Sequence, residues 1–169
     1  RGYGMAILPD MAQFEQMEVL RGADGLFSGA GKPGGSLNLV RKRPTREFQS
    51  NLLFSAAEWD RYRTELDVSG GLFADGAVRG RAVLAYEDGD TFEKVAHNEK
   101  TMFYGILEFD LSDATLLTLG GTYDDRDQPY TAFGLPRFSD GRDLKLPRNT
   151  YIAPSWATYD TRIDTLFLQ

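Results

Sequence analysis

After residue 46 the chain alternates between apolar and polar side chains along several long segments, and this period of two restricts its fold more than any other feature. In residues 61–72 the apolar face holds Tyr62, Leu66, Val68 and Leu72. The opposite face of the same segment holds Arg61, Arg63, Glu65, Asp67 and Ser69. Successive side chains of a β-strand point to opposite faces, so the pattern predicts antiparallel strands with one dry face and one wet face.

The same alternation recurs in residues 48–56, 78–87, 101–111, 115–125 and 159–168. These segments are roughly ten to twelve residues long, whereas ordinary strands have ~5–6 residues and a tilted strand that crosses a bilayer needs ~9–11. Aromatic side chains near the ends of the predicted dry faces would form an interfacial girdle. They are Phe48, Tyr62, Tyr86, Tyr123, Tyr159 and Phe167. Length and girdle together favour strands that span a membrane.

The connections between these segments fall into two classes. Residues 73–76 and 112–114 read as tight turns, whereas residues 89–98 and 127–157 read as longer irregular loops. Short turns on one rim and long loops on the other are typical of outer-membrane β-barrels. A soluble sheet with one solvated face is the alternative, and the strand length and loop asymmetry favour the barrel.

The first 45 residues differ from the rest because they mix glycine and proline with short apolar pieces. Asp10 followed by Gln13 resembles a capping box, which predicts a short helix that runs through about Glu15. The run Arg41-Lys42-Arg43-Pro44 ends the last apolar piece. We therefore expect a domain boundary directly after this run.

Composition argues against several classes of function. The 169 residues carry a net charge of −6, which disfavours nucleic-acid binding because phosphate contacts need clustered Lys and Arg. Cysteine is absent and His97 is the single histidine, so a His-based zinc site or a Ser-His-Asp triad could form only through His97. Asp124, Asp125 and Asp127 could hold a cation such as calcium, but without a defined ligand spacing a solvated loop is the simpler interpretation.

A glycine motif near the start of the chain has no nucleotide-binding context. Residues 29–34 formally match the dinucleotide fingerprint G-x-G-x-x-G. That fingerprint must open a helix after a buried strand, and Pro33 followed by two glycines does not suit a helix interior. We therefore expect these glycines to permit close backbone packing instead.

Three stretches of the chain resemble the plug signature of TonB-dependent siderophore receptors, which reads close to IEVLRGPAGLLYGxGxPGGxINLVTKRPT. The stretches are FEQMEVLRG at residues 14–22, GLFSG at residues 25–29 and PGGSLNLVRKRPT at residues 33–45. They follow one another at the spacing of the signature, with Ala23-Asp24 and Phe27 as small departures. The remainder of the chain resembles the first barrel strands of the same family.

The resemblance implies a mainly β fold, in which a transmembrane antiparallel β-barrel of about 22 strands encloses an α+β plug domain in its lumen. Residues 1–45 would be the C-terminal part of the plug, and residues 46–169 the N-terminal strands of the barrel, roughly six of them. So few strands do not close around a plug, and an open sheet edge in lipid leaves backbone groups unpaired. We therefore expect the functional protein to extend before Arg1 and beyond Gln169.

The resemblance also implies a receptor of the bacterial outer membrane that imports ferric siderophores, and not an enzyme. The expected partners are the ferric siderophore, TonB with the ExbB–ExbD inner-membrane complex, and the outer membrane with its lipopolysaccharide; nucleic acid is not expected. Iron would be ligated by the siderophore, so no cofactor, catalytic residue or protein metal ligand is expected. A TonB-dependent importer of haem, cobalamin or a carbohydrate is one alternative, and a soluble β-rich binding domain is another.

Two sets of site residues follow from the resemblance. The equivalent of Arg21 in related receptors pairs with barrel glutamates and holds the plug, and a buried arginine without carboxylates would be costly. An ion pair between Arg21 and Glu18 inside the plug is the alternative. For ligand binding we expect loop aromatics, whose rigid surfaces suit a bulky chelate; they could equally pack the loop onto itself or meet lipopolysaccharide. The candidates are Tyr130, Phe133, Tyr151 and Trp156.

Overall fold

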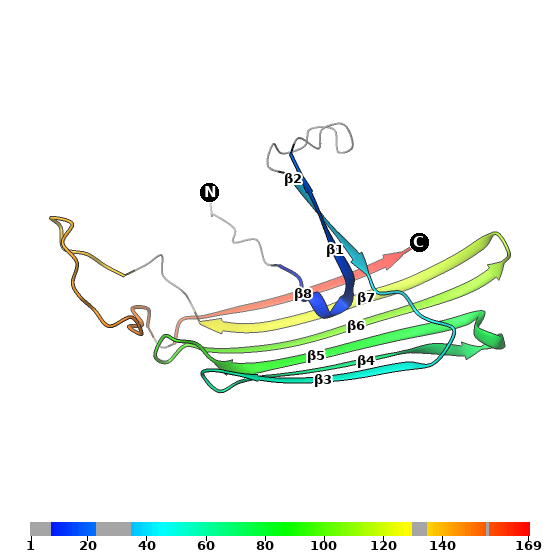
Figure 1. Ribbon diagram of the computed structural model, residues 1–169, viewed down its shortest axis with the longest axis horizontal. Coiled ribbons are helices and arrows are strands. Elements are labelled where there is room, and N and C mark those ends of the chain that lie inside the picture. Colours follow the sequence, from blue (N-terminus) through cyan, green and yellow to red (C-terminus); the bar gives the residue numbers. More distant parts are fainter. Residues whose placement is uncertain (1–7, 23–34, 130–134, 155) are drawn as a thin grey trace.

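The computed structural model describes residues 8–22, 35–129, 135–154 and 156–169. Its regular structure is a hairpin of β1 (Phe14–Arg21) and β2 (Gly35–Arg41), and a larger antiparallel sheet of six strands (Figure 1). The six strands are β3 (Gln49–Ala57), β4 (Arg61–Phe73), β5 (Val78–Asp90), β6 (His97–Ser112), β7 (Thr115–Pro129) and β8 (Thr158–Leu168). They pair in chain order from β3 to β8, which confirms the predicted mainly β fold. Within the described residues the large sheet is open, because β3 and β8 each pair with one neighbour.

The strands of the large sheet are long enough to cross a bilayer. The shortest, β3, has 9 residues and the longest, β6, has 16, whereas a tilted membrane strand needs ~9–11. At roughly 3.3 Å per residue, β6 extends over about 50 Å and exceeds the ~30 Å hydrocarbon core of a bilayer. No helix in the described ranges is long and apolar enough to span a membrane.

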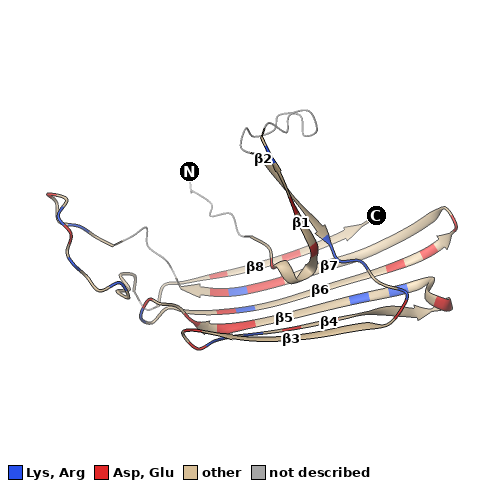
Figure 2. Cartoon of the chain, viewed as in Figure 1, with Lys and Arg blue, Asp and Glu red and all other residues tan. Residues whose placement is uncertain are grey.

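The two faces of the large sheet differ in composition, as the period of two predicts. Strand pairing sets Leu66, Leu84 and Phe103 in one row across β4, β5 and β6. We call this the outer face, and its most exposed apolar side chains include Phe48, Leu52, Phe54 and Leu72. The opposite face, the inner face, carries most of the charged residues that Figure 2 shows along the strands.

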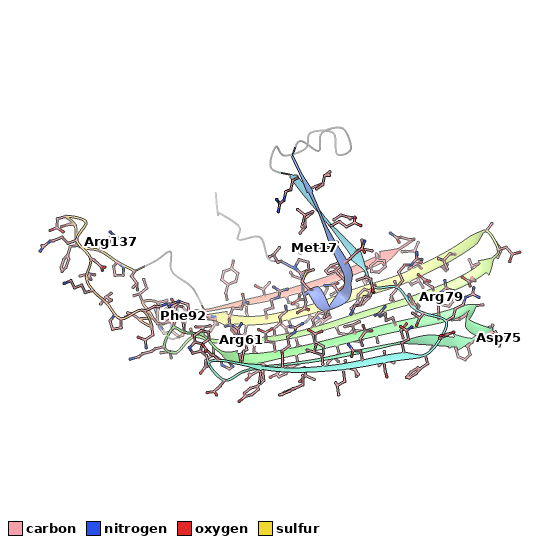
Figure 3. All side chains as sticks on the ribbon, viewed as in Figure 1. Met17, Arg61, Asp75, Arg79, Phe92 and Arg137 are labelled. Atoms are coloured by element: carbon pink, nitrogen blue, oxygen red, sulfur yellow. The ribbon has the colours of Figure 1, made fainter. Side chains whose placement is uncertain are left out.

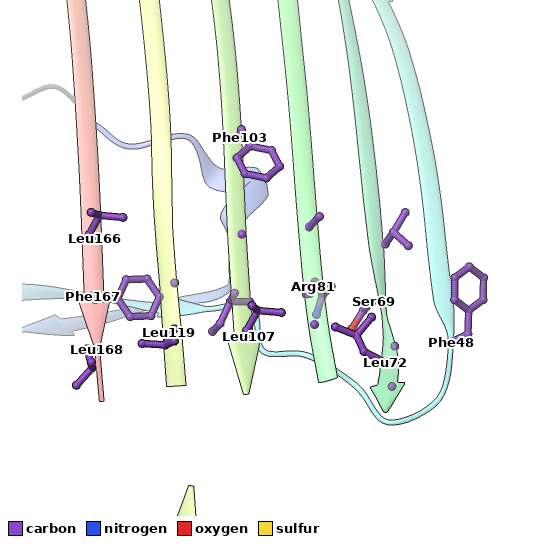
Figure 4. A pocket seen from close by; sticks show the side chains of 18 residues that line it. Phe48, Ser69, Leu72, Arg81, Phe103, Leu107, Leu119, Leu166, Phe167 and Leu168 are labelled. Carbon is purple, nitrogen blue, oxygen red and sulfur yellow. The ribbon is translucent and has the colours of Figure 1, made fainter. Parts of the chain in front are cut away.

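An apolar groove of about 870 Å³ crosses the outer face from Phe48, just before β3, to the end of β8 (Figure 4). The groove forms because Gly80, Ala82 and Gly105 have little or no side chain to fill it. Phe103 and Leu107 stand beside the groove. Toward the turn end the outer face is mainly apolar, which suits contact with lipid. Toward the loop end β7 and β8 add charged side chains to it, among them Asp125, Arg162 and Asp164.

A small hydrophobic core lies on the inner face, where the N-terminal segment (the described residues up to 46) rests on the sheet. The 3-10 turn η1 (Met11–Gln13) contributes Ala12 to this core. The buried members from the sheet are Val83, Ala85, Met102, Tyr104 and Ile106. Figure 1 shows η1 against the sheet and the hairpin β1-β2 rising away from it. So small a core leaves most of the docking of this segment to polar contacts.

The N-terminal segment begins with a single turn where the sequence predicts a helix. Asp10 caps this turn as expected, because its Oδ1 accepts a hydrogen bond of 2.8 Å from the backbone N–H of Ala12. The prediction that the helix runs to about Glu15 is wrong, since β1 starts at Phe14. Pairing of Phe14 with Arg41 across the hairpin overrides a helix signal that is marginal in so short a segment.

Two aromatic residues lie on the face opposite to the one predicted for them. The register places Phe167 opposite Gly120 and Tyr159 opposite Gln128, and both positions belong to the inner face. Phe167 packs against the core, with the Arg41 guanidinium 4.7 Å from its ring centroid. Because β8 carries apolar side chains on both faces, its alternation does not identify the dry one.

Short turns and longer loops lie at opposite ends of the large sheet, as predicted. β4 and β5 are joined by the 3-10 turn η2 (Ala74–Gly76), whereas β5 and β6 are joined at the other end by residues 91–96. Figure 3 places Asp75 at the turn end, and Phe92 and Arg137 at the loop end. The long loop after β7 also belongs to the loop end.

The variant Gly89→Ala tests how tightly β4 and β5 meet at the loop end. A Cβ at this position would lie 2.4 Å from the Cα of Arg61, a backbone atom that cannot move aside alone. We expect a loss of about 1–3 kcal/mol in the free energy of unfolding, the usual cost of overpacking. Thermal unfolding of the purified full-length protein measures this loss. Gly105→Ala is the control, because its Cβ would meet only the Phe103 ring, at 3.3 Å; equal losses in both variants would contradict the expectation.

Candidate functional site

Polar side chains of the N-terminal segment meet the charged inner face of the large sheet in two places. One lies at Asp10, immediately before η1, and the other lies between β2 and β3. We call the first the Asp10 clamp, formed by Asp10, Arg63 and Lys100. We call the second the linker anchor, formed by residues 42–46 and the sheet residues that bond to them. These contacts hold the N-terminal segment against the sheet, so they are the first candidate site.

The Asp10 clamp is a bidentate ion pair extended by a lysine. Arg63 of β4 donates from Nη2 to Asp10 Oδ1 at 2.8 Å and from Nη1 to Asp10 Oδ2 at 3.1 Å. Lys100 of β6 pairs with the same carboxylate. The Asp10 side chain is only 2% exposed, so its charge depends on these partners for compensation. The two-pronged guanidinium–carboxylate geometry is the strong form of such a pair.

Arg63 is also bonded within its own sheet. Its Nε donates to Glu65 Oε1 at 2.6 Å, and its Nη1 donates to Glu87 Oε2 at 3.1 Å. Glu87 lies directly opposite Arg63 in the register of β4 and β5, so this pair forms without help from Asp10. Beside the clamp, the Thr122 hydroxyl of β7 donates to the buried Gln13 Oε1 at 2.7 Å.

The linker anchor begins at Lys42, whose ammonium pairs with Asp67 of β4 at 2.8 Å. Arg81 of β5 donates to the same carboxylate from Nε at 2.8 Å and from Nη2 at 2.7 Å. The backbone is held as well, because the hydroxyl of the buried Tyr104 donates to the Lys42 carbonyl at 2.8 Å. One carboxylate of the sheet therefore binds one cation from the linker and one from the sheet.

The same arrangement repeats around Glu108, whose side chain is 2% exposed. Glu108 accepts hydrogen bonds from Arg43 Nε at 2.6 Å and from Arg79 Nε at 2.8 Å. Arg79 also donates to Asp110 at 2.8 Å, and Arg46 donates to Asp110 at 3.1 Å. Each carboxylate of this pair thus serves one arginine from the linker and one from the sheet.

Uncharged contacts complete the linker anchor. The backbone N–H and the hydroxyl of Thr45 both donate to Ser69 Oγ at 2.8 Å. The backbone N–H of Gly71 donates to the Arg46 carbonyl at 3.0 Å, and Arg81 Nη1 donates to the Arg43 carbonyl at 3.0 Å. The linker is therefore bonded to the sheet through its backbone as well as its side chains.

The predicted plug residue Arg21 lies exposed at the end of β1, in the hairpin that Met17 marks in Figure 3. Glu18 accepts hydrogen bonds from Gln16 Nε2 at 2.6 Å and from Asn38 Nδ2 at 2.8 Å. A separation of three residues puts Arg21 and Glu18 on opposite faces of β1, and no ion pair joins them in the part of the chain that the structure describes. Pairing of Arg21 with barrel glutamates stays a prediction.

Two of the predicted ligand-binding aromatics, Tyr130 and Phe133, lie outside the described residues. Tyr151 is half-buried and lines a cavity of about 280 Å³ at the loop end of the sheet. Trp156 lies outside this cavity and is 81% exposed. A role of any of these aromatics in ligand binding stays a prediction.

The cavity lies where several loops meet, and we call it the loop cavity; it is lined by Phe92, Glu93, Leu135, Arg148, Tyr151, Ile152 and Ala153. The Arg148 guanidinium lies 5.4 Å from the centroid of the Phe92 ring, a contact that contributes about 0.5–1 kcal/mol at an exposed site. Trp59, from the connection between β3 and β4, meets Phe92 edge to face with ring centroids 6.5 Å apart. The walls are mainly apolar, with Arg148 and Glu93 as the two charged side chains, and such a cavity can bind a planar part of a ligand that carries polar groups.

Another part of the long loop packs onto itself. The carboxylate of Asp140 accepts hydrogen bonds from the backbone N–H of Arg142 at 3.0 Å and from Arg142 Nε at 2.6 Å. These bonds hold the pKa of Asp140 below its ordinary value. The Arg142 guanidinium also lies 5.2 Å from the Phe138 ring centroid. This local turn lies apart from the residues that line the loop cavity.

The carboxylates considered for a cation site point in different directions. β7 extends to Pro129, so Asp124 and Asp125 lie in a strand as the alternation of residues 115–125 predicts, and Asp127 lies in the same strand and not in the loop predicted for residues 127–157. Asp124 bonds to Arg126 at 2.6 Å on the inner face, whereas Asp125 accepts from the Tyr123 hydroxyl at 2.8 Å on the outer face. Among the described residues, no group of three or more His, Asp and Glu side chains is placed to hold a metal ion. The expected absence of protein metal ligands stays a prediction.

Sequence reasoning misses the main contacts between the N-terminal segment and the sheet. It identifies Asp10 only as a helix cap, although this residue bonds to Arg63, 53 positions away. It also misses Phe92 and Arg148 of the loop cavity. The one available signal is the cluster of arginines on the wet faces of the predicted strands, which calls for carboxylates but does not say from which segment they come.

Comparison with curated proteins finds close relatives, although no family model matches the chain. The ferripyoverdine receptor of Pseudomonas aeruginosa is 42% identical over 163 residues, which are 95% of this chain and 20% of that protein. The ferric-pyoverdine BN7/BN8 receptor of Pseudomonas putida is 44% identical over 160 residues, which are 93% of this chain and 20% of that protein. The chain thus spans about a fifth of the length of these relatives.

Comparison with solved structures agrees. The crystal structure of the ferripyoverdine receptor of the Pseudomonas aeruginosa outer membrane, bound to ferripyoverdine, matches with a TM-score of 0.86 and 42% identity. The match covers 94% of this chain and 22% of that one. The likeness therefore includes both the hairpin and the six-stranded sheet. These relatives are receptors and not enzymes.

The variant Glu108→Gln tests the linker anchor. Removing one partner of a buried ion pair commonly costs about 3–5 kcal/mol, and here the neutral amide would face both Arg43 and Arg79. We expect the linker to detach more often, so that trypsin cuts the folded full-length protein faster after Lys42 and Arg46; Arg43 precedes Pro44 and is not a trypsin site. Glu99→Gln in the same strand is the control, because Glu99 bonds to the Tyr86 hydroxyl and not to the linker. Unchanged cleavage of the linker in Glu108→Gln would contradict this role.

Proposed function

Because the chain belongs to the TonB-dependent outer-membrane receptors, we propose that it is part of a receptor that imports ferric siderophores of the pyoverdine class. The observation that carries this proposal is the identity of 42% and 44% to two ferric-pyoverdine receptors over 95% and 93% of the chain. One such receptor is known in complex with ferripyoverdine. The match includes the loop end of the sheet as well as the strands, which supports a shared class of ligand.

The two faces of the large sheet support a barrel wall around a wet lumen. The outer face exposes Phe48, Leu52 and Phe54 in the way that contact with lipid requires. The inner face is charged and receives the polar N-terminal segment. We assign residues 1–45 to the C-terminal part of the plug and residues 46–169 to the first barrel strands, since the hairpin and the large sheet are separate sheets.

In this proposal transport involves no covalent chemistry on the cargo. Iron enters as a ferric siderophore whose own groups ligate the metal, so the protein supplies neither a cofactor nor metal ligands. TonB with the ExbB–ExbD complex supplies the energy by pulling on the plug from the periplasm. The surrounding partners are the outer membrane and its lipopolysaccharide, which face the apolar outer surface and the loop end.

The loop cavity is the part of the described chain best suited to contact the cargo. Tyr151 and Phe92 offer rigid aromatic surfaces, and Arg148 offers a cation over one of them. Rigid aromatic contacts lose little conformational entropy on binding. This arrangement suits the planar and polar groups of an iron chelate.

Uptake of iron by intact cells tests the proposed function. The full-length gene is expressed in a host strain that lacks its own pyoverdine receptors, and radioactive iron is supplied as ferric pyoverdine under iron limitation. We expect accumulation well above that of the empty-vector strain, and surface binding without accumulation in a strain that lacks TonB. Accumulation of haem, cobalamin or a carbohydrate in place of every ferric pyoverdine would overturn the proposal.

The variant Tyr151→Ala tests the loop cavity. Truncation of an aromatic contact residue commonly weakens binding by more than ~1 kcal/mol, so we expect the Kd for ferric pyoverdine to rise by about tenfold. Equilibrium binding to purified receptor in detergent measures this change. Phe138→Ala is the matched control, because this aromatic of the same loop packs on Arg142 outside the cavity. Equal affinity of Tyr151→Ala and wild type would exclude the cavity as a contact site.

A further inference from the structure

The Asp10 clamp and the linker anchor hold opposite ends of the described N-terminal segment. Among the described residues, Asp10 is the one nearest the N-terminus whose side chain bonds to the sheet. The linker anchor lies at the other end and continues directly into β3. A pull from the N-terminal side therefore loads the clamp before it loads the anchor.

The sheet half of the clamp remains compensated when Asp10 leaves. Arg63 keeps its hydrogen bonds to Glu65 at 2.6 Å and to Glu87 at 3.1 Å. An uncompensated buried charge is what makes the loss of an ion pair costly. Lys100 is the one clamp cation without such a network in the described contacts, and its side chain is 19% exposed. The clamp can therefore open without leaving Arg63 unpaired.

Water can reach the clamp from one side. An open pocket of about 560 Å³ adjoins Asp10 and is lined by Leu8, Met11, Lys42, Arg63, Glu65 and Lys100 among others. Its charged lining can hydrate Lys100 and the Asp10 carboxylate as they separate. This pocket lies between the N-terminal segment and the sheet, where a passage would have to widen.

The linker anchor is built differently, because several bonds must break together. Asp67, Glu108 and Asp110 each hold a linker cation. Backbone groups of Lys42, Arg43, Thr45 and Arg46 also bond to the sheet. By contrast, the one charged group of the clamp that comes from the segment is the Asp10 carboxylate. Beside it Ala12 packs in the small core, and Gln13 bonds to Thr122 and, through its carbonyl, to the backbone N–H of Lys42 at 3.0 Å, at the start of the linker anchor.

We propose that the Asp10 clamp opens during transport while the linker anchor stays bonded, so that the N-terminal segment pivots about residues 42–46. The inference rests on the proposed function, because that function supplies the pull. It makes Asp10 a positioning residue: the carboxylate keeps the segment against Arg63 and Lys100 at rest and gives way under force. The passage for the cargo then opens beside Asp10, and the linker is the fixed hinge.

Cross-linking in the full-length receptor on intact cells tests the proposal. One variant carries Asp10→Cys with Arg63→Cys, and its matched control carries Thr45→Cys with Ser69→Cys. The chain has no cysteine of its own, so a short bifunctional thiol reagent with a reducible spacer joins only the introduced pair within it. Uptake and surface binding of radioactive ferric pyoverdine are measured before cross-linking, after it, and after reduction.

We expect the Asp10–Arg63 cross-link to abolish uptake, to leave surface binding intact, and to be reversed by reduction. The Thr45–Ser69 cross-link should leave uptake unchanged. Uptake that persists with the Asp10–Arg63 cross-link would overturn the proposal, and so would loss of uptake with the Thr45–Ser69 cross-link. Failure of the unmodified wild-type receptor to import any ferric pyoverdine would instead overturn the proposed function.

A second measurement avoids cysteine. Asp10→Asn removes the charge but keeps the shape, whereas Asp10→Glu keeps the charge. We expect Asp10→Asn cells to become more sensitive to a large antibiotic that the outer membrane normally excludes, and Asp10→Glu to restore much of the resistance. Equal sensitivity of wild type and Asp10→Asn at equal receptor levels would count against a clamp that keeps the lumen closed.

Discussion

Charge compensation on the inner face of the large sheet is the constraint on which the rest of the structure depends. Arg63, Arg79 and Arg81 stand on two adjacent strands with little exposure to water, so each must have a carboxylate within reach. Strand register supplies these carboxylates, since Glu87 lies opposite Arg63 and Glu108 lies opposite Arg79. The sheet is thereby compensated before the N-terminal segment docks, and that segment binds to carboxylates and guanidinium groups that already have partners.

The apolar outer face follows from the same geometry. A period of two cannot place charge on one face without leaving the other face free for apolar side chains, and here Leu66, Leu84 and Phe103 occupy it. In water so large an apolar surface would promote association. A membrane wall satisfies both faces, because lipid covers the apolar outer face and water hydrates the charged inner face. Strand length, loop asymmetry and the charge of the inner face therefore all indicate the same membrane wall.

The sequence predicts the strands and turns well because alternation is a local property of the chain. It predicts the site poorly because the site is formed by residues that are distant in the sequence. Where one face was clearly charged, as in residues 61–72, both the strand and its orientation are correct. In β8 the charged residues Asp160, Arg162 and Asp164 share a face with Leu166 and Leu168, and strand pairing turns that face outward, so Phe167 is assigned to the wrong face. Arg21 stands out through its motif, whereas Asp10 acquires its role only when β4 and β6 bring Arg63 and Lys100 to it. Pairings over such distances depend on register and docking, which no local pattern encodes.

The chemistry of the two clamp cations explains how one contact can be both specific and releasable. A guanidinium has several N–H donors in a planar fork, so Arg63 can align Asp10 while it stays bonded to Glu65 and Glu87. A lysine at that position would be a compact point charge that could not hold three carboxylates in fixed directions. Lys100 suits the complementary task, because a flexible ammonium neutralises the Asp10 carboxylate in place and becomes hydrated when the carboxylate leaves. Orientation and neutralisation of Asp10 are thus divided between two strands, and Arg63 keeps its bonds to Glu65 and Glu87 when the clamp opens.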